Sequence, residues 1–586
     1  MLSKLLRVIR RIQSYIYHNY KFYRHRIVGK CEFKTNEVFG DNFYKTLVVN
    51  YCLNDVVEVA NELLENKLRY YSNVPVAFDK LESAWFTDIY SGYKWDEKKY
   101  FKDTVIRPIG QNVDIKVPWE VSRLHHLVIL AISFRETKNE LYRNKLLSDL
   151  ICFINCNPPG YGPNWVYSME VAIRITNIII ALDFAFGTSD FKNKSIVNKY
   201  LIFCIEHIID NMEWRGAIRN NHYFISLFGL YIASRRFDEY HRYCVIKKFS
   251  SQEMVNEVTF HILPDGGGSE HSTSYHRLNL EMLTYFFYLS DETSFSFTFK
   301  DRVYLITHFL FLPPDLKLRK RKSFTEAKKR YFSGIDFLNS ITLKDGTYPL
   351  VGDNDSGRII KISKNVASYW SSNNYFSSFM LLGNTLTQPC ENKSFLLKIT
   401  EGQELINKIK KIEGVTLITN LRVVESGNCL LAYDFDIDLN ISKFYFYKDF
   451  GLFLIKNDDF LIAIRLPVSR AKIPGHYHED SYTVNVFFNK EWILKDNGTY
   501  SYNYDRNEYF HNKRMQSHNF KTTFEISNDC KVCCCVDDNL NFLLYDGNNL
   551  IYKVVLSEGK LSLFCNKDVH IENKCYYNEY LGVGIN

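Results

Sequence analysis

The sequence lacks the features that mark several classes of protein. No apolar stretch is long enough to cross a bilayer, so we expect no transmembrane segment. Lysine and arginine form no long tract, and the densest basic run, at 316–322, is typical of a solvated loop. We therefore expect no nucleic-acid partner. The fourteen cysteines show no regular disulfide spacing, and this favours reduced thiols and a cytoplasmic protein.

The N-terminus also lacks the pattern of a secretory signal. Residues 1–26 are basic and amphipathic, with neither a continuous apolar core nor a cleavage site. The pattern favours a helix that packs on the following domain over a segment that binds a membrane surface. We expect a cytoplasmic location, with the periplasm as the alternative.

The composition indicates a large, ordered and mildly basic protein. A chain of 586 residues exceeds what one hydrophobic core usually supports, so we expect at least two domains. Hydrophobic residues make up 46% and aromatic residues 16%, which excludes general disorder. The net charge of +7 is compatible with an anionic ligand.

The hydrophobic pattern changes once along the chain. Between about residues 42 and 382, apolar residues recur at spacings of three and four, which predicts successive helices in a toroid or solenoid of hairpins. After about residue 397, short alternating or β-branched runs predict an antiparallel β domain, most simply a sandwich. We divide the chain into a helical extension over 1–100, which packs on the helical domain over 101–390, and a β domain over 391–586.

The segment GHYHEDSYTVNVFF carries two histidines one residue apart, ahead of an alternating run. Side chains two apart in a strand point to one face, so we predict that His476 and His478 face one cavity. Two imidazoles there indicate a metal site or a proton-transfer site. His478, Asp496 and His518 form a set that suits zinc and leaves a position for water.

Three further clusters carry candidate chemistry, although each alone fits a structural role. Asn221 and His222 follow a capping asparagine at the start of an apolar helix. A glycine-rich loop at 265–268 precedes a helix that bears Tyr275. The third cluster is a polar turn at 353–358.

In combination, the segments NNHYF, DGGGSEHSTSYH, GDNDSGR, HYHEDS and KDNGTYSY resemble the heparinase II/III-like polysaccharide lyases, which include oligoalginate lyases. PWEVSRL and NWVYSMEVAIRITN resemble the substrate-facing helices of this family. The resemblance covers roughly residues 110–530. It implies an α+β multidomain fold, with an N-terminal incomplete (α/α) toroid followed by a C-terminal antiparallel β-sandwich.

The resemblance also implies a reaction, β-elimination beside a uronic acid in an anionic polysaccharide. Such a reaction needs a neutralised carboxylate, a base for the C5 proton and an acid for the leaving oxygen. Asn221 and His222 would hold the carboxylate. Tyr275 would protonate the leaving oxygen and, for some stereochemistries, also take the proton, whereas His476 would be the other base.

The remaining implied residues hold metal or substrate. The metal set of His478, Asp496 and His518 would hold zinc in a mainly structural role. The expected substrate contacts are Glu120, Arg123, Glu170, Arg174, Arg358, Tyr500, Tyr502 and Arg506.

Two other functions remain open from the sequence. One is a metal-dependent glycan hydrolase or esterase, in which zinc activates water. The other is a non-degradative glycan-binding protein that acts in capsule or O-antigen biosynthesis.

Overall fold

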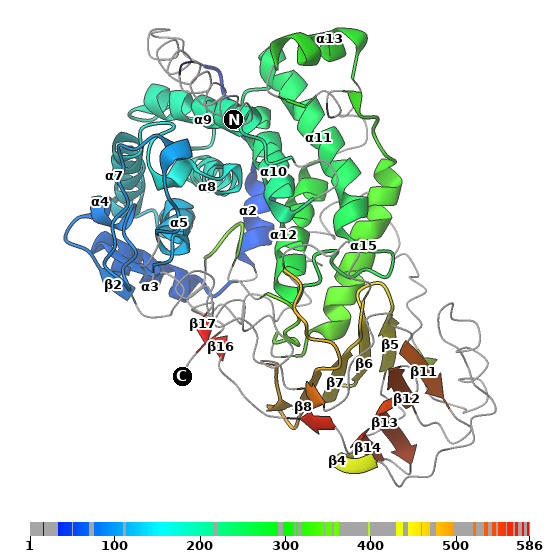
Figure 1. Ribbon diagram of the computed structural model, residues 1–586. Helices are drawn as coiled ribbons and strands as arrows, with labels where there is room; N and C mark the ends of the chain where they lie inside the picture. The colour runs from blue at the N-terminus through cyan, green and yellow to red at the C-terminus, as the bar shows by residue number, and fades with distance from the viewer. Residues whose placement is uncertain are drawn as a thin grey trace, which may run out of the picture.

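The computed structural model has a large helical domain that leads into antiparallel sheets (Figure 1). The residues that the structure describes are 16, 33–49, 51–69, 75–108, 113–214, 219–290, 297–309, 312–313, 316, 318–344, 346–353, 357–362, 397–398, 429–436, 443–458, 460–468, 476–496, 520–522, 532–536, 542–546, 549–557, 560–566, 569–571, 577–578 and 583–584.

The described part of the N-terminal segment lies against the helical domain. It contains helices α2 (Asp41–Val48), α3 (Leu53–Leu64) and α4 (Leu81–Ala84), and η1 (Phe101–Asp103) follows it. The Asp183 carboxylate on α8 accepts hydrogen bonds from the backbone nitrogens of Val38 at 2.9 Å and Phe39 at 3.0 Å. The segment is not wholly helical, because strands β1 (Lys67–Arg69) and β2 (Pro75–Ala77) form an antiparallel hairpin that we did not predict.

The helical domain follows the predicted pattern of successive helices. They are α5 (Lys116–Ser122), α6 (His125–Thr137), α7 (Glu140–Cys156), η2 (Pro163–Trp165), α8 (Ser168–Phe186), α9 (Lys194–Asp210), α10 (Asn221–Arg236), α11 (His241–His261), α12 (Thr273–Leu289), α13 (Phe299–His308) and α15 (Phe324–Ile341). Helix α8 packs against α6, α9 and α10, so it is buried on all sides (Figure 1). Among the described helices, none combines the length and the apolar character that a membrane span needs.

The C-terminal region forms two main antiparallel sheets, which confirms the predicted fold class. One sheet has the order β3-β5-β6-β7-β8-β9 and the other β11-β12-β13-β14-β4. The Tyr552 hydroxyl on β13 donates to the Tyr482 carbonyl, just before β8, at 2.8 Å and so joins the two sheets. The strands are β3 (Leu397–Lys398), β4 (Cys429–Asp436), β5 (Lys443–Tyr447), β6 (Leu452–Lys456), β7 (Phe460–Arg465), β8 (Val484–Phe488), β9 (Glu491–Leu494), β10 (Phe520–Thr522), β11 (Val532–Val536), β12 (Phe542–Asp546), β13 (Asn549–Ser557), β14 (Lys560–Asn566), β15 (Val569–Ile571), β16 (Tyr577–Asn578) and β17 (Val583–Gly584).

The glycine-rich loop ahead of α12 is where the β domain meets the helical domain. The Asp265 carboxylate accepts hydrogen bonds from the backbone nitrogens of Asp449 at 2.7 Å and Phe450 at 2.8 Å. A Cβ at Gly267 would lie 2.3 Å from the Phe450 side chain, so the contact requires glycine. This contact fixes the β domain beside the N-terminal end of α12, where Tyr275 lies.

Candidate active site

Asn221 is the first residue of α10, as predicted. The Asn220 side chain caps the helix and accepts a hydrogen bond from the Tyr223 nitrogen at 3.4 Å. Asn221 has no exposed surface, and its backbone nitrogen donates to Glu270 Oε1 at 2.9 Å. Its side-chain Oδ1 and Nδ2 have no hydrogen-bond partner among the described residues. Since a buried amide normally has partners, this one suits a ligand or an ordered water.

His222 follows Asn221 and is partly open to solvent, with 29% of its side chain exposed. Its Nδ1 lies 2.9 Å from Glu213 Oε1, and its ring meets the edge of Tyr167 at a centroid distance of 5.1 Å. Burial acts to lower the pKa of His222. The Glu213 carboxylate, together with Glu170 and Glu270, outweighs burial and raises that pKa above its usual value. The site therefore favours a positively charged imidazole beside the Asn221 amide.

Tyr275 lies in the first turn of α12. The Ser272 hydroxyl caps this helix and accepts a hydrogen bond from the Tyr275 nitrogen at 3.2 Å. The Tyr275 ring, which belongs to a residue only 5% exposed, stacks on the His476 ring with a centroid distance of 3.7 Å and an interplanar angle of 22°. The structure thus places the predicted acid and the predicted base in direct contact across the domain interface.

His476 and His478 converge for a different reason from the one we predicted. Strand β8 begins only at Val484, and Tyr482 has a left-handed φ of 68°, so both histidines lie in the loop before the strand. The prediction that His476 and His478 share one face of a strand is wrong, because the loop that carries them does not have strand geometry. Instead, His476 Nδ1 lies 3.0 Å from Asp353 Oδ2, and His478 Nε2 lies 2.7 Å from Asp353 Oδ1.

Asp353 is a site residue that the sequence did not assign. It is fully buried, its nitrogen donates to the His476 carbonyl at 2.9 Å, and its carbonyl accepts from the Ser272 hydroxyl at 2.6 Å. The preceding Gly352 has a φ of +68°, and a Cβ there would lie 2.4 Å from the His271 carbonyl oxygen. One carboxylate therefore orients both histidines and ties them to the cap of α12.

Glu270 is the second residue that the sequence did not assign. Its Oε1 accepts from the Asn221 nitrogen at 2.9 Å, whereas Oε2 has no hydrogen-bond partner in the described ranges. Burial raises the pKa of Glu270, and the charges of His476 and His222 act in the opposite direction. Glu270 thus lies between the Asn221–His222 pair and the Tyr275–His476 pair. Both Glu270 and Asp353 belong to polar motifs in the sequence, which was the only signal that could have identified them.

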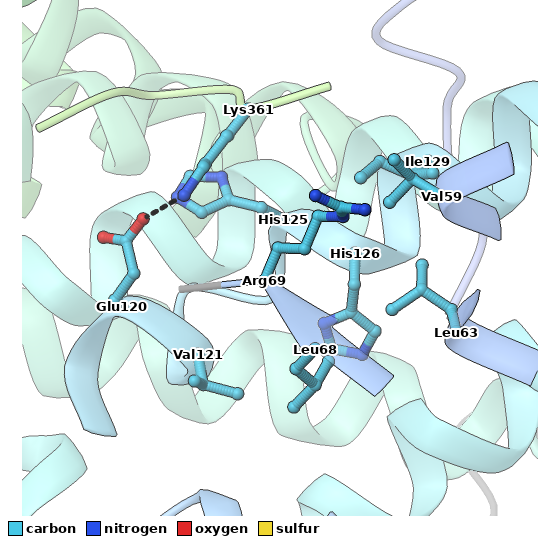
Figure 2. Close-up of a pocket in the computed structure, with 10 residues that line it drawn as sticks. All are labelled: Val59, Leu63, Leu68, Arg69, Glu120, Val121, His125, His126, Ile129 and Lys361. Atoms are coloured by element: carbon cyan, nitrogen blue, oxygen red, sulfur yellow. Dashed lines mark hydrogen bonds and ion pairs between the residues drawn. The ribbon is translucent and has the colours of Figure 1, made fainter. Parts of the chain in front are cut away.

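Three of the predicted substrate contacts form one buried network. Arg123 binds both oxygens of Glu170, at 2.8 and 2.9 Å, and Glu120 Oε2 at 3.0 Å. Glu120 also binds Lys361 at 3.3 Å (Figure 2). The network reaches the candidate site, because Glu170 is among the groups that raise the pKa of His222.

The other two predicted contacts that the structure describes, Arg174 and Arg358, are also buried. Arg174 has no exposed surface and donates to the carbonyls of Ser122 at 2.8 Å and Asn164 at 2.6 Å, so it holds the interior together. Arg358 is 3% exposed, and burial lowers its pKa to about 9, with Arg277 contributing. Tyr500, Tyr502 and Arg506 lie outside the described residues.

The predicted metal set fits a metal in part. His478 and Asp496 are 1% and 3% exposed, and Asp496 follows β9 as predicted, while His518 lies outside the described residues. Nε2 of His478 faces Asp353, so a metal would have to bind this ring at Nδ1. Histidines that bind a metal through one ring nitrogen often contact a carboxylate with the other. Elsewhere in the described ranges, Glu82, Cys152 and Cys156 bring possible ligand atoms within 4.8 Å, but burial raises the pKa of the Cys152 thiol to about 12.

Comparison with known families agrees with the resemblance in the sequence. Residues 61–303 match the family model of the heparinase II/III N-terminus. This region of the chain therefore carries a heparinase II/III N-terminal domain. The match covers α5 to α12, and so includes Asn221, His222 and Tyr275 of the candidate site.

Solved structures similar to this chain share little sequence with it. A heparinase III is 14% identical over 90% of this chain and 78% of its own, with a TM-score of 0.45. A mutant of the heparan sulfate lyase HepC from Pedobacter heparinus is 13% identical over 94% of this chain and 72% of its own, with a TM-score of 0.42. A second heparinase III, with methylated lysines, is 14% identical over 97% and 75%, with a TM-score of 0.40. No match was found among curated proteins.

Proposed function

We propose that this protein is a polysaccharide lyase that cleaves a uronate-containing anionic glycan by β-elimination. One observation carries the proposal: an unpaired buried amide at Asn221 and a charged His222 lie beside the stacked Tyr275–His476 pair. The amide and the imidazolium suit a carboxylate, and the stacked pair suits proton transfer. The family of the helical domain supports the same chemistry.

The proposed reaction follows from these positions. Asn221 and His222 bind the uronate carboxylate and stabilise the negative charge that develops when C5 loses its proton. Asp353 accepts a hydrogen bond from His476 Nδ1–H, so Nε2 carries the lone pair that takes the C5 proton. The electron pair forms the C4–C5 double bond, the C4–oxygen bond breaks, and the Tyr275 hydroxyl protonates the leaving oxygen. For the opposite stereochemistry at C5, Tyr275 would also take the proton.

An ultraviolet assay tests the proposal directly. Purified protein would be incubated with alginate, heparan sulfate, hyaluronan and chondroitin, and the absorbance of the new double bond would be followed. A rise in absorbance on one of them establishes elimination and identifies the class of uronate. New reducing ends without this absorbance, lost on chelation, would instead favour the metal-dependent hydrolase.

Replacing Glu213 with glutamine is expected to move the alkaline limit of kcat/KM to lower pH. Glu213 contributes to the raised pKa of His222, and without it burial acts against the charged form. In the wild-type protein, the charged form of His222 is lost as pH rises through the raised pKa, and without Glu213 this loss comes at lower pH. The measurement is a pH–rate profile of both proteins. An unchanged alkaline limit would show that Glu213 does not keep His222 charged.

We propose further that His478, Asp496 and His518 hold a zinc ion that organises the loops of the β domain. Purified wild-type protein is then expected to contain about one zinc per chain by mass spectrometry, and Asp496→Asn to contain much less. The variant should also unfold at a lower temperature, because metal binding stabilises the folded state. Asp458→Asn, which alters an exposed carboxylate, is the control. Fully folded wild-type protein without metal would refute the site.

A further inference from the structure

Helix α13 carries an exposed apolar stripe at the end of the helical domain that lies away from the β domain (Figure 1). Phe299, Val303 and Ile306 are spaced by four and three residues, so their side chains lie along one side of the helix. They are 87%, 42% and 43% exposed, whereas Asp301 and Leu305 hold the helix on the domain through another side. Apolar residues that are exposed as a group indicate an interaction surface.

The basic run at 316–322 presents a further exposed apolar residue. The run is anchored rather than freely solvated, because Leu316 is 1% exposed and Arg319 donates to the Glu253 carboxylate at 2.7 Å. Between these two anchors, Leu318 is 64% exposed. The fold therefore holds this leucine in solvent, although the residues on either side of it are attached to the domain.

Gln252 of α11 joins this loop to α13. Its side-chain nitrogen donates to the Arg319 carbonyl at 2.7 Å, and its side-chain oxygen accepts from Arg302 of α13 at 3.4 Å. Arg302 and Arg319 each adjoin an exposed apolar residue in the chain, so the stripe and the exposed leucine belong to one surface. This surface, the α13 face, consists of Phe299, Val303, Ile306 and Leu318.

Exposed cations flank the α13 face. Lys300 lies on α13, and Lys320 and Arg321 lie in the loop that carries the exposed leucine. The acidic residue of α13, Asp301, is buried and binds Lys248 at 2.7 Å. Its charge is therefore balanced within the fold and does not offset the cations at the surface.

The N-terminal segment enters the described fold next to α13. The Lys34 backbone nitrogen donates to the Tyr240 hydroxyl at 3.0 Å. Tyr240 directly precedes His241, whose ring contacts that of Tyr304 on α13 at a centroid distance of 4.7 Å. Residues 1–30 contain eight lysines and arginines and neither aspartate nor glutamate. A strongly basic part of the chain thus leads into the end of the molecule that bears the α13 face.

We propose that the α13 face binds the surface of a bilayer that contains anionic lipids. An apolar stripe flanked by lysine and arginine is the pattern of helices that lie in the interface of a membrane. Phe299 and Leu318 would enter the boundary between headgroups and acyl chains, and Lys300 and Lys320 would meet lipid phosphates. A second protein fits the surface less well, since lysine is depleted in protein–protein interfaces. The proposal does not depend on the lyase reaction.

Flotation of the full-length protein with lipid vesicles tests the proposal. Neutral vesicles contain phosphatidylcholine, and anionic vesicles contain phosphatidylcholine and phosphatidylglycerol in equal parts. Binding to the anionic vesicles is expected to be at least about tenfold tighter than to the neutral ones and to weaken as salt is added. Phe299→Ser combined with Leu318→Ser should weaken this binding by about tenfold or more. Lys300→Gln combined with Lys320→Gln should remove most of the preference for anionic vesicles.

Leu141→Ser is the matched control, because Leu141 is 59% exposed and lies on α7, far from α13 in the helical domain (Figure 1). It should bind vesicles as the wild-type protein does. The proposal is overturned if the wild-type protein does not bind, or if the control loses binding as much as the Phe299 and Leu318 variant. Undiminished binding by that variant would also overturn it and would assign the membrane contact to another segment. A concentration-dependent dimer without vesicle binding, lost in the same variant, would show instead that a second copy covers the face.

Discussion

Replacing Tyr275 with phenylalanine is expected to lower kcat for elimination by about a hundredfold to ten-thousandfold. The change removes the phenolic oxygen that would protonate the leaving group, and it keeps the ring that stacks on His476 at 3.7 Å. Because the stack and the carboxylate contacts remain, KM should change little. The measurement is steady-state kinetics on the glycan that gives the absorbance rise.

Tyr285→Phe is the matched control for this variant. Tyr285 lies on the same helix, α12, is fully buried, and its hydroxyl donates to Glu281 at 3.3 Å. Its loss should reduce the free energy of unfolding by about 1 kcal/mol and leave kcat unchanged. If Tyr275→Phe kept wild-type kcat, another group would have to supply the proton. If both variants lost activity alike, the effect would be one of folding.

Replacing Asp353 with asparagine is the second change with a large expected effect. An asparagine has one oxygen where the aspartate has two, so it cannot accept from both His476 and His478. His476 would lose the partner that fixes its proton on Nδ1, and kcat should fall by about a hundredfold or more. The loss of one buried hydrogen bond to a charged group should also lower the free energy of unfolding by about 1–3 kcal/mol.

Kinetics and chemical denaturation of the same preparation separate these two effects. Asp183→Asn is the control, because Asp183 is a buried carboxylate on α8 that accepts backbone hydrogen bonds from Val38 and Phe39 in the N-terminal segment. It should lose stability and keep kcat per folded molecule. Wild-type kcat in Asp353→Asn would show that His476 needs no carboxylate partner, and it would refute the role of Asp353.

Local sequence signals predicted one half of the candidate site. Asn220 and Ser272 are capping residues whose side chains bind backbone nitrogens three residues ahead, so the starts of α10 and α12 follow from nearest neighbours. Those starts place Asn221, His222 and Tyr275 in first helical turns. The resemblance to the family then gave these residues their roles, which stay predictions until activity is measured.

The histidine loop shows where sequence reasoning failed. The alternation from Tyr482 to Phe488 predicted a strand that would carry both histidines, but the left-handed backbone at Tyr482 interrupts it. The alternation of side chains correctly predicted strand β8, but the prediction was wrong for the residues before it. A short alternating run does not specify where a strand begins. Similarly, the pattern of charges on α8 did not show that Arg174 lies in the interior.

By itself, the sequence determined the helical and β regions and the starts of the helices that bear Asn221 and Tyr275. Those features depend on interactions within a few residues, or on motifs that a single chain displays. Only the tertiary structure decided that Asp353 holds both histidines, since His476 lies 123 residues away from it along the chain. It also decided that Glu270 lies between the Asn221–His222 pair and the Tyr275–His476 pair. Contacts between segments so far apart depend on how the domains pack, and no local pattern encodes that packing.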